Sequence, residues 1–304
     1  MSSLESSIFA LIKLLGDDHL EVVEAARAKL VELGGVAVSF LEKAVLSNED
    51  SKIRVEAKQV IEEIRLDSVR RDWADNARLS DERLDLERSV FLLARVCYPQ
   101  MRTSEYQTRL DRLAQKIRRK IRWMRKPESR LIAMSDVLFD DEKFQGNWAD
   151  YFDPQNSYLN SVLDRKMGIP ISLSVLYLLL AQRLRIPMKG VGIPGHFMVK
   201  YQDEQREIYL DPFNGGRMLT RPECVQFILE AGFPYQAEFM EGIGTRDILG
   251  RMLRNLILIY LDRHEQTLEK TLARFLELLY VEAGSTTIDD GSSDEDPNRA
   301  QPGS

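Results

Sequence analysis

Two stretches near the start of the chain share one pattern of apolar and polar positions. Residues 20–33 and 52–64 carry apolar side chains three and four positions apart, which is the spacing of a helix with one buried face. The stretches match at an offset of 31 residues, with the corresponding pairs Val22 and Ile53, Ala26 and Ala57, Leu30 and Ile61, and Leu33 and Ile64. The pattern predicts an all-α repeat arm over residues 1–66. A plain helical bundle is the alternative interpretation.

The helical period continues beyond this arm. Residues 67–130 are expected to form a helical part that leads into the core, with one helix from about Glu105 to Trp123. A C-terminal helix is expected over residues 246–282. The composition then shifts to Ser, Thr, Gly, Asp, Glu and Pro without aromatic residues, which predicts a disordered acidic tail over residues 283–304.

The pattern changes between residues 156 and 219. Pro170 begins a run to Leu184 that is apolar nearly all round, which predicts a helix buried in the core. The segments HFMVKY (196–201) and REIYLD (206–211) then alternate with a period of two. This alternation predicts an antiparallel hairpin that follows the buried helix.

The predicted hairpin brings an imidazole and a carboxylate together. If residues 202–205 join the strands, the register places Lys200 opposite Glu207 as a charge pair. It places Val199 opposite Ile208 and Phe197 opposite Leu210 as apolar pairs. It also places His196 opposite Asp211. Directly opposed residues have Cβ atoms about 4.5–5.5 Å apart, so this pair is within reach of a hydrogen bond. The alternative is a histidine that ends a strand and an aspartate that begins a turn before Pro212.

The motifs of this region resemble those of the transglutaminase-like superfamily, whose members use Cys-His-Asp for acyl transfer or peptide hydrolysis. That family has Gly-x-Cys at the start of a core helix, Ile-Pro after the helix, and the His and Asp on adjacent strands. The corresponding positions here are Gly168, Pro170, Ile186-Pro187, His196 and Asp211. The phrases GIPISLSVLYLLLAQRL, GVGIPGHF and LDPFNGG are similar to the SirB-type branch, the second transglutaminase-like core, over roughly residues 81–235.

This resemblance implies an α+β fold class. A papain/transglutaminase-like core, in which the core helix packs on a small antiparallel sheet, is expected over residues 131–245 behind the all-α arm. The arm itself resembles HEAT-type helical repeats, with Gly34 and Gly35 at the break between helices.

The nucleophile of this chemistry is missing from its expected position. Pro170 stands where the family has its cysteine, and proline has no side-chain group that can attack a carbonyl. Ser172, in the first helical turn, is a candidate substitute, but it is rotated by about 200° around the helix from Pro170, which favours a cap or core role. Cys97 and Cys224 lie outside the motif and are expected to be small buried residues.

Four further residues are expected to line the presumed cleft. Asn156, Asn160 and Asn214 carry amides that can hydrogen-bond a substrate, and Gly195 directly precedes the histidine. Turn and cap roles are the alternative for the three asparagines.

Composition argues against several classes of partner. A net charge of −6 argues against nucleic acid and anionic membranes as partners of the whole chain. The basic run from Lys116 to Lys126 is interleaved with apolar residues at helical spacing, which favours a solvated helix face over a nucleic-acid patch. Two distant cysteines and three histidines argue against a metal site, and no cofactor is expected. Without an apolar run of about 20 residues, a cytoplasmic location is expected.

Three hypotheses for the function follow. The favoured one is a transglutaminase-like module without catalytic activity that binds a peptide or protein, with the arm as a second surface. The second is an acyl transferase or hydrolase that uses His196 and Asp211 with Ser172 or an activated water. The third is a scaffold in which His196 and Asp211 only hold the hairpin together.

Overall fold

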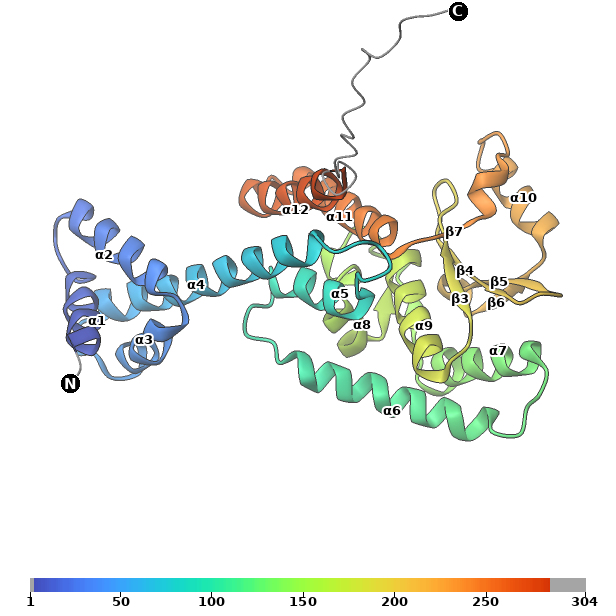
Figure 1. Ribbon diagram of the computed structural model, residues 1–304, viewed down its shortest axis with the longest axis horizontal. Helices are drawn as coiled ribbons and strands as arrows, with labels where there is room; N and C mark the ends of the chain where they lie inside the picture. Colours follow the sequence, from blue (N-terminus) through green and yellow to red (C-terminus); the bar gives the residue numbers. More distant parts are fainter. Residues whose placement is uncertain (1–2, 285–304) are drawn as a thin grey trace, which may run out of the picture.

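The chain forms a helical arm joined to a larger core of helices and one antiparallel sheet (Figure 1). The computed structural model describes residues 3–284, so residues 285–304 of the expected acidic tail lie outside the described residues. The α-helices are α1 (Ser3–Leu14), α2 (Leu20–Leu33), α3 (Gly35–Ser47), α4 (Ser51–Ala77), α5 (Leu86–Arg95), α6 (Thr103–Ile121), α7 (Pro127–Ser135), α8 (Leu159–Arg165), α9 (Pro170–Leu184), α10 (Arg221–Glu230), α11 (Thr245–Asp262) and α12 (Gln266–Gly284).

The main sheet has the strand order β6-β5-β4-β3-β7, and every neighbouring pair in it is antiparallel. Its strands are β3 (Met188–Val191), β4 (Met198–Gln202), β5 (Glu207–Asp211), β6 (Arg217–Leu219) and β7 (Gly242–Ile243). Two short strands, β1 (Gln145–Gly146) and β2 (Met167–Gly168), pair in parallel just before α9. Short helical turns are η1 (Asp136–Asp141), η2 (Pro154–Asn156), η3 (Pro212–Asn214) and η4 (Ala237–Met240).

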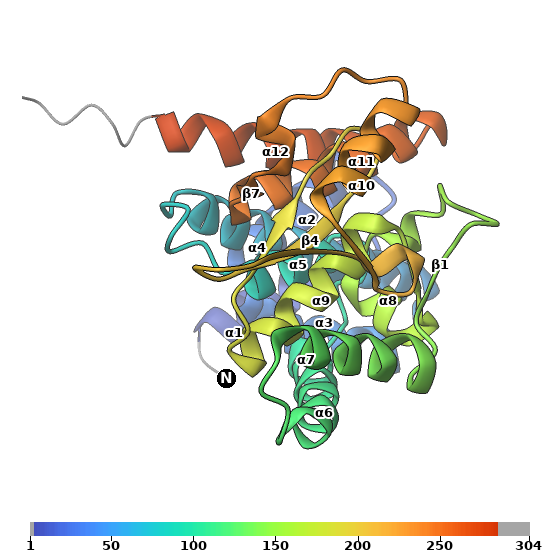
Figure 2. The ribbon, with the colours of Figure 1, turned by 90° about the vertical axis from the view of Figure 1, so that its right-hand side faces the viewer.

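Helix α9 lies at the centre of the core. Every residue of α9 except Gln182 and Arg183 is buried, as its nearly continuous apolar run predicts. Strands β3 and β4 pack across this helix (Figure 2). Each fully buried leucine in such a helix contributes about 1.5–3 kcal/mol to folding. The predicted α+β class, with a core helix packed on a small antiparallel sheet, is confirmed.

The register of the β4–β5 hairpin differs from the prediction by two residues. The observed pairs are Val199 with Leu210, Lys200 with Tyr209, Tyr201 with Ile208 and Gln202 with Glu207. The turn lies one residue later than expected, because the Asp203 N–H donates to the Arg206 carbonyl at 3.0 Å and the Asp203 carboxylate accepts from the Gln205 N–H. A shift of two residues keeps each side chain on its face, so predicted partners still meet diagonally.

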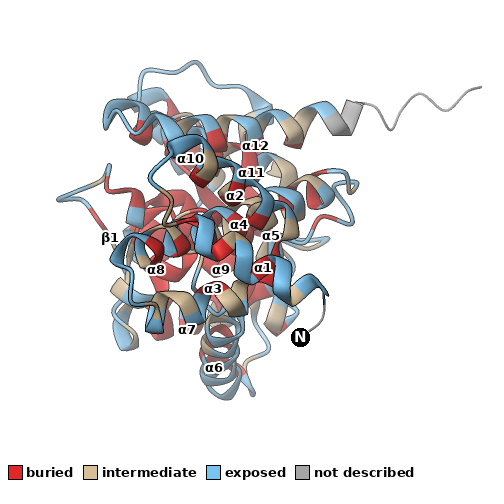
Figure 3. Cartoon of the chain, turned by 90° about the vertical axis from the view of Figure 1, so that its left-hand side faces the viewer, coloured by how far each residue is buried: buried red, intermediate tan, exposed pale blue. Residues whose placement is uncertain are grey.

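Helix α4 joins the arm to the core without a break. The boundary expected between residues 66 and 67 falls inside this helix, since no Gly or Pro interrupts it. Its first half packs with α1 to α3, whose outward sides carry mostly exposed residues (Figure 3). Its second half enters the core, where Trp73 stacks on Phe275 of α12 with ring centroids 4.7 Å apart and donates its indole N–H to the Phe275 carbonyl.

Two expectations outside the core change in detail. Residues 246–282, expected as one helix, belong to two helices, because the chain reverses after Asp262 with His264 in the left-handed conformation at φ 58°. On α6, Lys116 pairs with Asp141 and Glu142, and Lys120 pairs with Asp136. Part of the basic run is therefore neutralised by the neighbouring η1 segment.

Within residues 3–284, no helix combines the length and apolar character needed to cross a membrane.

Candidate functional site

A tight turn places His196 at the start of β4. The His196 N–H donates to the Ile193 carbonyl at 3.2 Å, and the two central residues of this turn are Pro194 and Gly195. Gly195 has φ 72°, the conformation that the third position of a type II turn requires and that glycine adopts without strain. Gly195 therefore contributes to the backbone turn that orients His196. Gly195 itself is exposed to solvent.

Asp211 ends β5 and caps the short turn η3. One of its carboxylate oxygens, Oδ1, accepts from the backbone N–H groups of Phe213 and Asn214. The other, Oδ2, lies 2.9 Å from His196 Nε2 and accepts from the Asn214 side-chain amide at 2.7 Å. The structure thus brings His196 and Asp211 together, and it assigns Asn214 to orienting the aspartate.

The histidine–aspartate pair is almost closed to water. His196 is 8% exposed and Asp211 is 4% exposed. Burial alone would raise the pKa of the Asp211 carboxyl, but the hydrogen bonds and charge of His196, together with the Asn214 donors, outweigh it and lower this pKa. Asp211 is therefore a carboxylate at neutral pH, and its contact with Nε2 fixes the orientation of the imidazole.

The first turn of α9 faces this pair. The Ser174 hydroxyl donates to the Phe197 carbonyl at 3.4 Å, and Pro170 lies one helical turn earlier on the same side of the helix. Gly168, just before α9, pairs with Gly146, and the Gly146 backbone lies so close to the Phe213 ring that no side chain would fit there. The buried Pro170 therefore lies on the same side of α9 as Ser174, which contacts the residue that follows His196.

Ser172 is held on another side of the helix. Its hydroxyl donates to the Asn156 carbonyl at 2.5 Å and accepts from the Ile169 N–H at 3.0 Å. This N–H is one of the free donors at the start of α9, so Ser172 acts as a cap. A Cβ at Gly168 would lie 2.7 Å from the Ser172 oxygen, which explains the glycine there. The serine is 1% exposed, and within residues 3–284 its hydroxyl bonds to Asn156 and Ile169 and not to His196.

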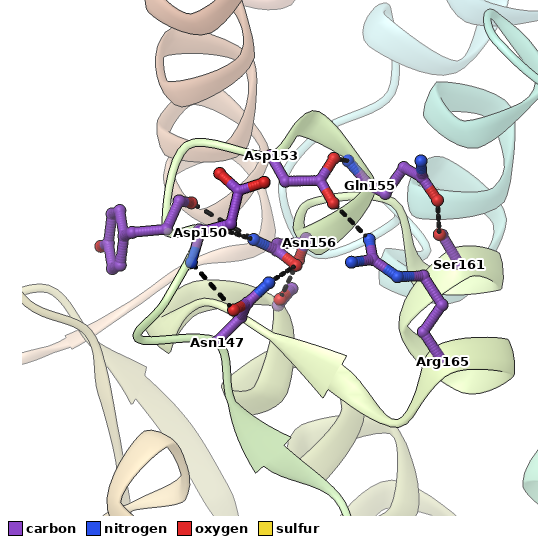
Figure 4. Close-up of polar contacts among 9 residues, drawn as sticks. Asn147, Asp150, Asp153, Gln155, Asn156, Ser161 and Arg165 are labelled. Carbon is purple, nitrogen blue, oxygen red and sulfur yellow. Dashed lines mark hydrogen bonds and ion pairs between the residues drawn. The ribbon is translucent and has the colours of Figure 1, made fainter.

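Asn156 does not line the cleft as expected. It is fully buried, and its amide nitrogen donates to the carbonyls of Asp150 and Tyr151 while its oxygen accepts from Asn147 (Figure 4). All its side-chain groups are therefore used by the loop between β1 and η2. This network fixes the loop against the first turn of α9, because the Asn156 carbonyl also accepts from Ser172.

Asn160 lies at a different place from the one expected. It belongs to α8 and lines a hollow of about 530 Å³ together with Cys97 and Tyr106, which does not include His196. Cys97 contacts the hydroxyls of Tyr158 and Tyr260.

The two cysteines are poor nucleophiles in this structure. Burial raises the pKa of the Cys97 thiol. Cys224 is fully buried, and burial followed by the nearby charges of Glu223 and Asp211 raises its pKa to about 12. Both residues are therefore thiols at neutral pH.

Aromatic residues and one arginine around the pair were not predicted. Phe213 and Phe227 lie beside the His196 ring, with ring centroids 6.1 and 5.3 Å away. Arg251 of α11 donates from Nη2 to the carbonyls of Ile193 and His196, at 2.5 and 2.8 Å. The cluster of aromatic residues in the polar segment GNWADYFD (146–153) is a signal that sequence reasoning could have used. The position of Arg251 could not be predicted in this way, because in the sequence it looks like any other arginine of an amphipathic helix.

Comparison with known proteins agrees with this geometry. Residues 104–254 match the family model described as Transglutaminase-like superfamily. The chain is 35% identical over 194 residues to a UPF0162 protein of Xylella fastidiosa (strain 9a5c), which covers 62% of this chain and 69% of that protein. It is also 35% identical over 160 residues to F-box only protein 21 of Homo sapiens, covering 49% of this chain and 25% of that protein. No solved structure gives a significant match.

These matches define the class: residues 104–254 form a transglutaminase-like domain, and the chain belongs to the UPF0162 family of the Xylella protein. Its bacterial relatives include, besides the Xylella protein, the UPF0162 protein PA3419 of Pseudomonas aeruginosa, which is 37% identical over 106 residues, or 34% of this chain and 38% of that protein.

Proposed function

We propose that the region around His196 and Asp211 is a peptide- or protein-binding site without catalytic activity. The observation that carries this proposal is that no side chain in the first turn of α9 is available as a nucleophile. Pro170 stands where the resemblance places the nucleophile, and the hydroxyl of Ser172 is already hydrogen-bonded to Asn156 and Ile169. A serine that must attack a carbonyl needs a base within hydrogen-bond reach, and its two backbone partners compete with that role.

The two cysteines give no replacement nucleophile, because burial keeps both as thiols at neutral pH. In F-box only protein 21 the matching segment forms a quarter of a longer chain, which supports a module that works beside other parts. We further propose a SirB-type branch within the superfamily, HEAT-like character for the arm, the arm as a second binding surface, and a cytoplasmic location.

Purified protein tests this proposal directly. Incubation with an electrophilic serine probe and with a mixed panel of peptides and esters should give neither labelling nor turnover. The same peptides, fluorescently labelled, should bind reversibly, and substitution of the exposed Trp148 beside the site should weaken binding. Labelling at Ser172, or turnover of any panel member, would exclude the non-catalytic proposal.

One observation favours a second candidate, an acyl transferase or hydrolase. The His196–Asp211 contact of 2.9 Å has the arrangement of a general base and its orienting carboxylate. In that case a water activated by His196, rather than a side chain, would attack the carbonyl. Turnover that is lost in His196→Ala and unchanged in Ser172→Ala would select this candidate. A scaffold role, in which the pair only holds the hairpin, predicts neither binding nor turnover.

A further inference from the structure

Aromatic side chains around His196 are linked by a chain of ring contacts. The Trp148 and Phe213 ring centroids are 4.4 Å apart, and the His196 ring lies 6.1 Å from Phe213 and 5.3 Å from Phe227. The outer rings are accessible to a ligand, since Trp148 and Phe152 are each 70% exposed and Phe227 is 38% exposed, whereas Phe213 between them is buried. A contiguous patch of exposed aromatic side chains is typical of an interaction site.

The loop that presents this surface is held in place. The Asn156 side chain binds the carbonyls of Asp150 and Tyr151, and the Asn147 oxygen accepts from the Asp150 N–H at 3.1 Å (Figure 4). Asp153 adds an ion pair with Arg165 of α8 at 2.6 Å. A loop whose backbone is fixed in this way loses little backbone entropy when a ligand binds.

Arg251 places a positive charge next to the His196 backbone and close to Tyr151 of the same loop. Its guanidinium donates to two neutral carbonyls and lies 5.5 Å from the Phe197 ring centroid, so hydrogen bonds hold it while its charge stays uncompensated. Within residues 3–284, none of the ion pairs involves Arg251. Burial lowers the pKa of Arg251 and the charge of nearby Arg254 acts in the same direction, yet a guanidinium remains protonated at neutral pH. A carboxylate brought to this position would supply the missing counter-charge.

We propose that the surface formed by Trp148, Phe152, Phe227 and Arg251 binds an acidic peptide segment, in which an Asp or Glu side chain pairs with Arg251 beside a large apolar residue. The inference rests on the proposed binding function and specifies the ligand of that same site.

Two sets of short fluorescent peptides test the proposal. Each peptide is N-acetylated and C-amidated, and carries one Phe and one Glu at varied spacing in a background of Gly, Ser and Ala; the matched set carries Gln in place of Glu. Fluorescence anisotropy should show about tenfold tighter binding of the best Glu peptide than of its Gln partner, because a charge-assisted hydrogen bond is lost. Equal affinity for both sets would overturn the inference.

Variants of the protein locate the binding. Trp148→Ala should weaken the best Glu peptide about tenfold, whereas Trp123→Ala, which removes another exposed tryptophan beyond the end of α6, should leave its affinity unchanged. Arg251→Met should abolish the preference for Glu over Gln, and Arg251→Lys should retain part of it. If Arg251→Met does not fold, the Glu and Gln comparison on the unmodified protein and the Trp148→Ala variant still decide the question. A Trp148→Ala protein that binds normally would also overturn the inference.

The two levels of proposal fail in different ways. If no peptide of either set binds, the proposed binding function itself is wrong. If both sets bind equally and Trp148→Ala weakens both, the binding function stands and only the acidic ligand is wrong.

Discussion

The two sides of the candidate site use their polar groups differently. At the start of α9, the Ser172 hydroxyl and the Asn156 amide are bonded to backbone groups, so the fold itself uses them. On the hairpin side, the His196 ring nitrogen and an Asp211 oxygen are bonded to each other, beside the exposed Trp148 and Phe227. The α9 side is thus a capped helix start. The hairpin side is a buried ionisable pair with exposed aromatic residues next to it.

This difference separates polar groups that the fold requires from polar groups that it does not require. A helix start requires caps for its free N–H groups, and Ser172 supplies one. A hairpin requires no buried imidazole and carboxylate, since a buried ion pair is often no more stabilising than apolar residues of similar volume. The pair is therefore the part of the site whose presence points to function, whereas the helix start carries Pro170 where the resemblance leads us to expect a cysteine.

The largest expected effect follows from breaking the pair. Asp211→Asn replaces the Oδ2 acceptor by an amino group, which then faces the Asn214 donor inside the protein. Loss of one partner of a buried charged pair should lower the free energy of unfolding by about 3 kcal/mol at neutral pH, measured by urea denaturation. The exposed Asp150→Asn is the matched control and should change stability by no more than about 0.5 kcal/mol. Equal stability of the two variants would mean that the pair is not formed.

A pH series sharpens the same comparison. The pKa of Asp211 is lowered in the folded protein, so its contribution to stability is fully present above the ordinary carboxyl value of about 3.9 and is lost as the pH falls through the lower folded value. The stability difference between the unmodified protein and Asp211→Asn should therefore shrink when the pH is lowered from about 4 toward 2. A difference that stays constant over this range would exclude a lowered pKa for Asp211.

Sequence patterns predicted the buried helix well because its signal is local. The apolar run from Pro170 to Leu184 and the proline at its first position determine where α9 begins and that it is buried. The meeting of His196 and Asp211 was also predictable, because the face of a strand depends only on its period of two. Both features need no knowledge of distant parts of the chain.

Features that depend on packing were not predictable in the same way. The hairpin register shifted by two residues because Asp203 forms a turn with Gln205 and Arg206, and several polar residues in that segment could have done so. Asn156 lies inside the loop network and Asn160 faces another hollow, which depends on how the loop between β1 and α8 folds back. The α4 helix crosses the expected boundary because the arm and core share it.

A new thiol at the start of α9 tests whether the two sides face each other. Pro170→Cys should place a thiol near His196, whose imidazole would lower the thiol pKa and raise its alkylation rate near neutral pH by at least about tenfold over an ordinary cysteine. The rate is measured with iodoacetamide followed by mass spectrometry of the modified peptide. Cys97 and Cys224 provide internal references, which should react slowly because burial raises their pKa values.

The double variant Pro170→Cys with His196→Ala gives the control for this experiment. Removal of the imidazole should return the alkylation rate to that of an ordinary thiol. A rate that does not depend on His196 would show that Pro170 does not occupy the nucleophile position.

The smallest expected effect concerns Ser172, and it separates a cap from a nucleophile. Ser172→Ala removes a hydroxyl that bonds to the Asn156 carbonyl and the Ile169 N–H, so the free energy of unfolding should fall by about 1 kcal/mol. Ser174→Ala is the matched control on the same helix, and its single, longer bond to the Phe197 carbonyl predicts a smaller loss. Peptide binding should be unchanged in both variants. If the unmodified protein instead hydrolyses an ester or amide and Ser172→Ala alone abolishes the activity, the serine is the nucleophile and the site is that of an enzyme.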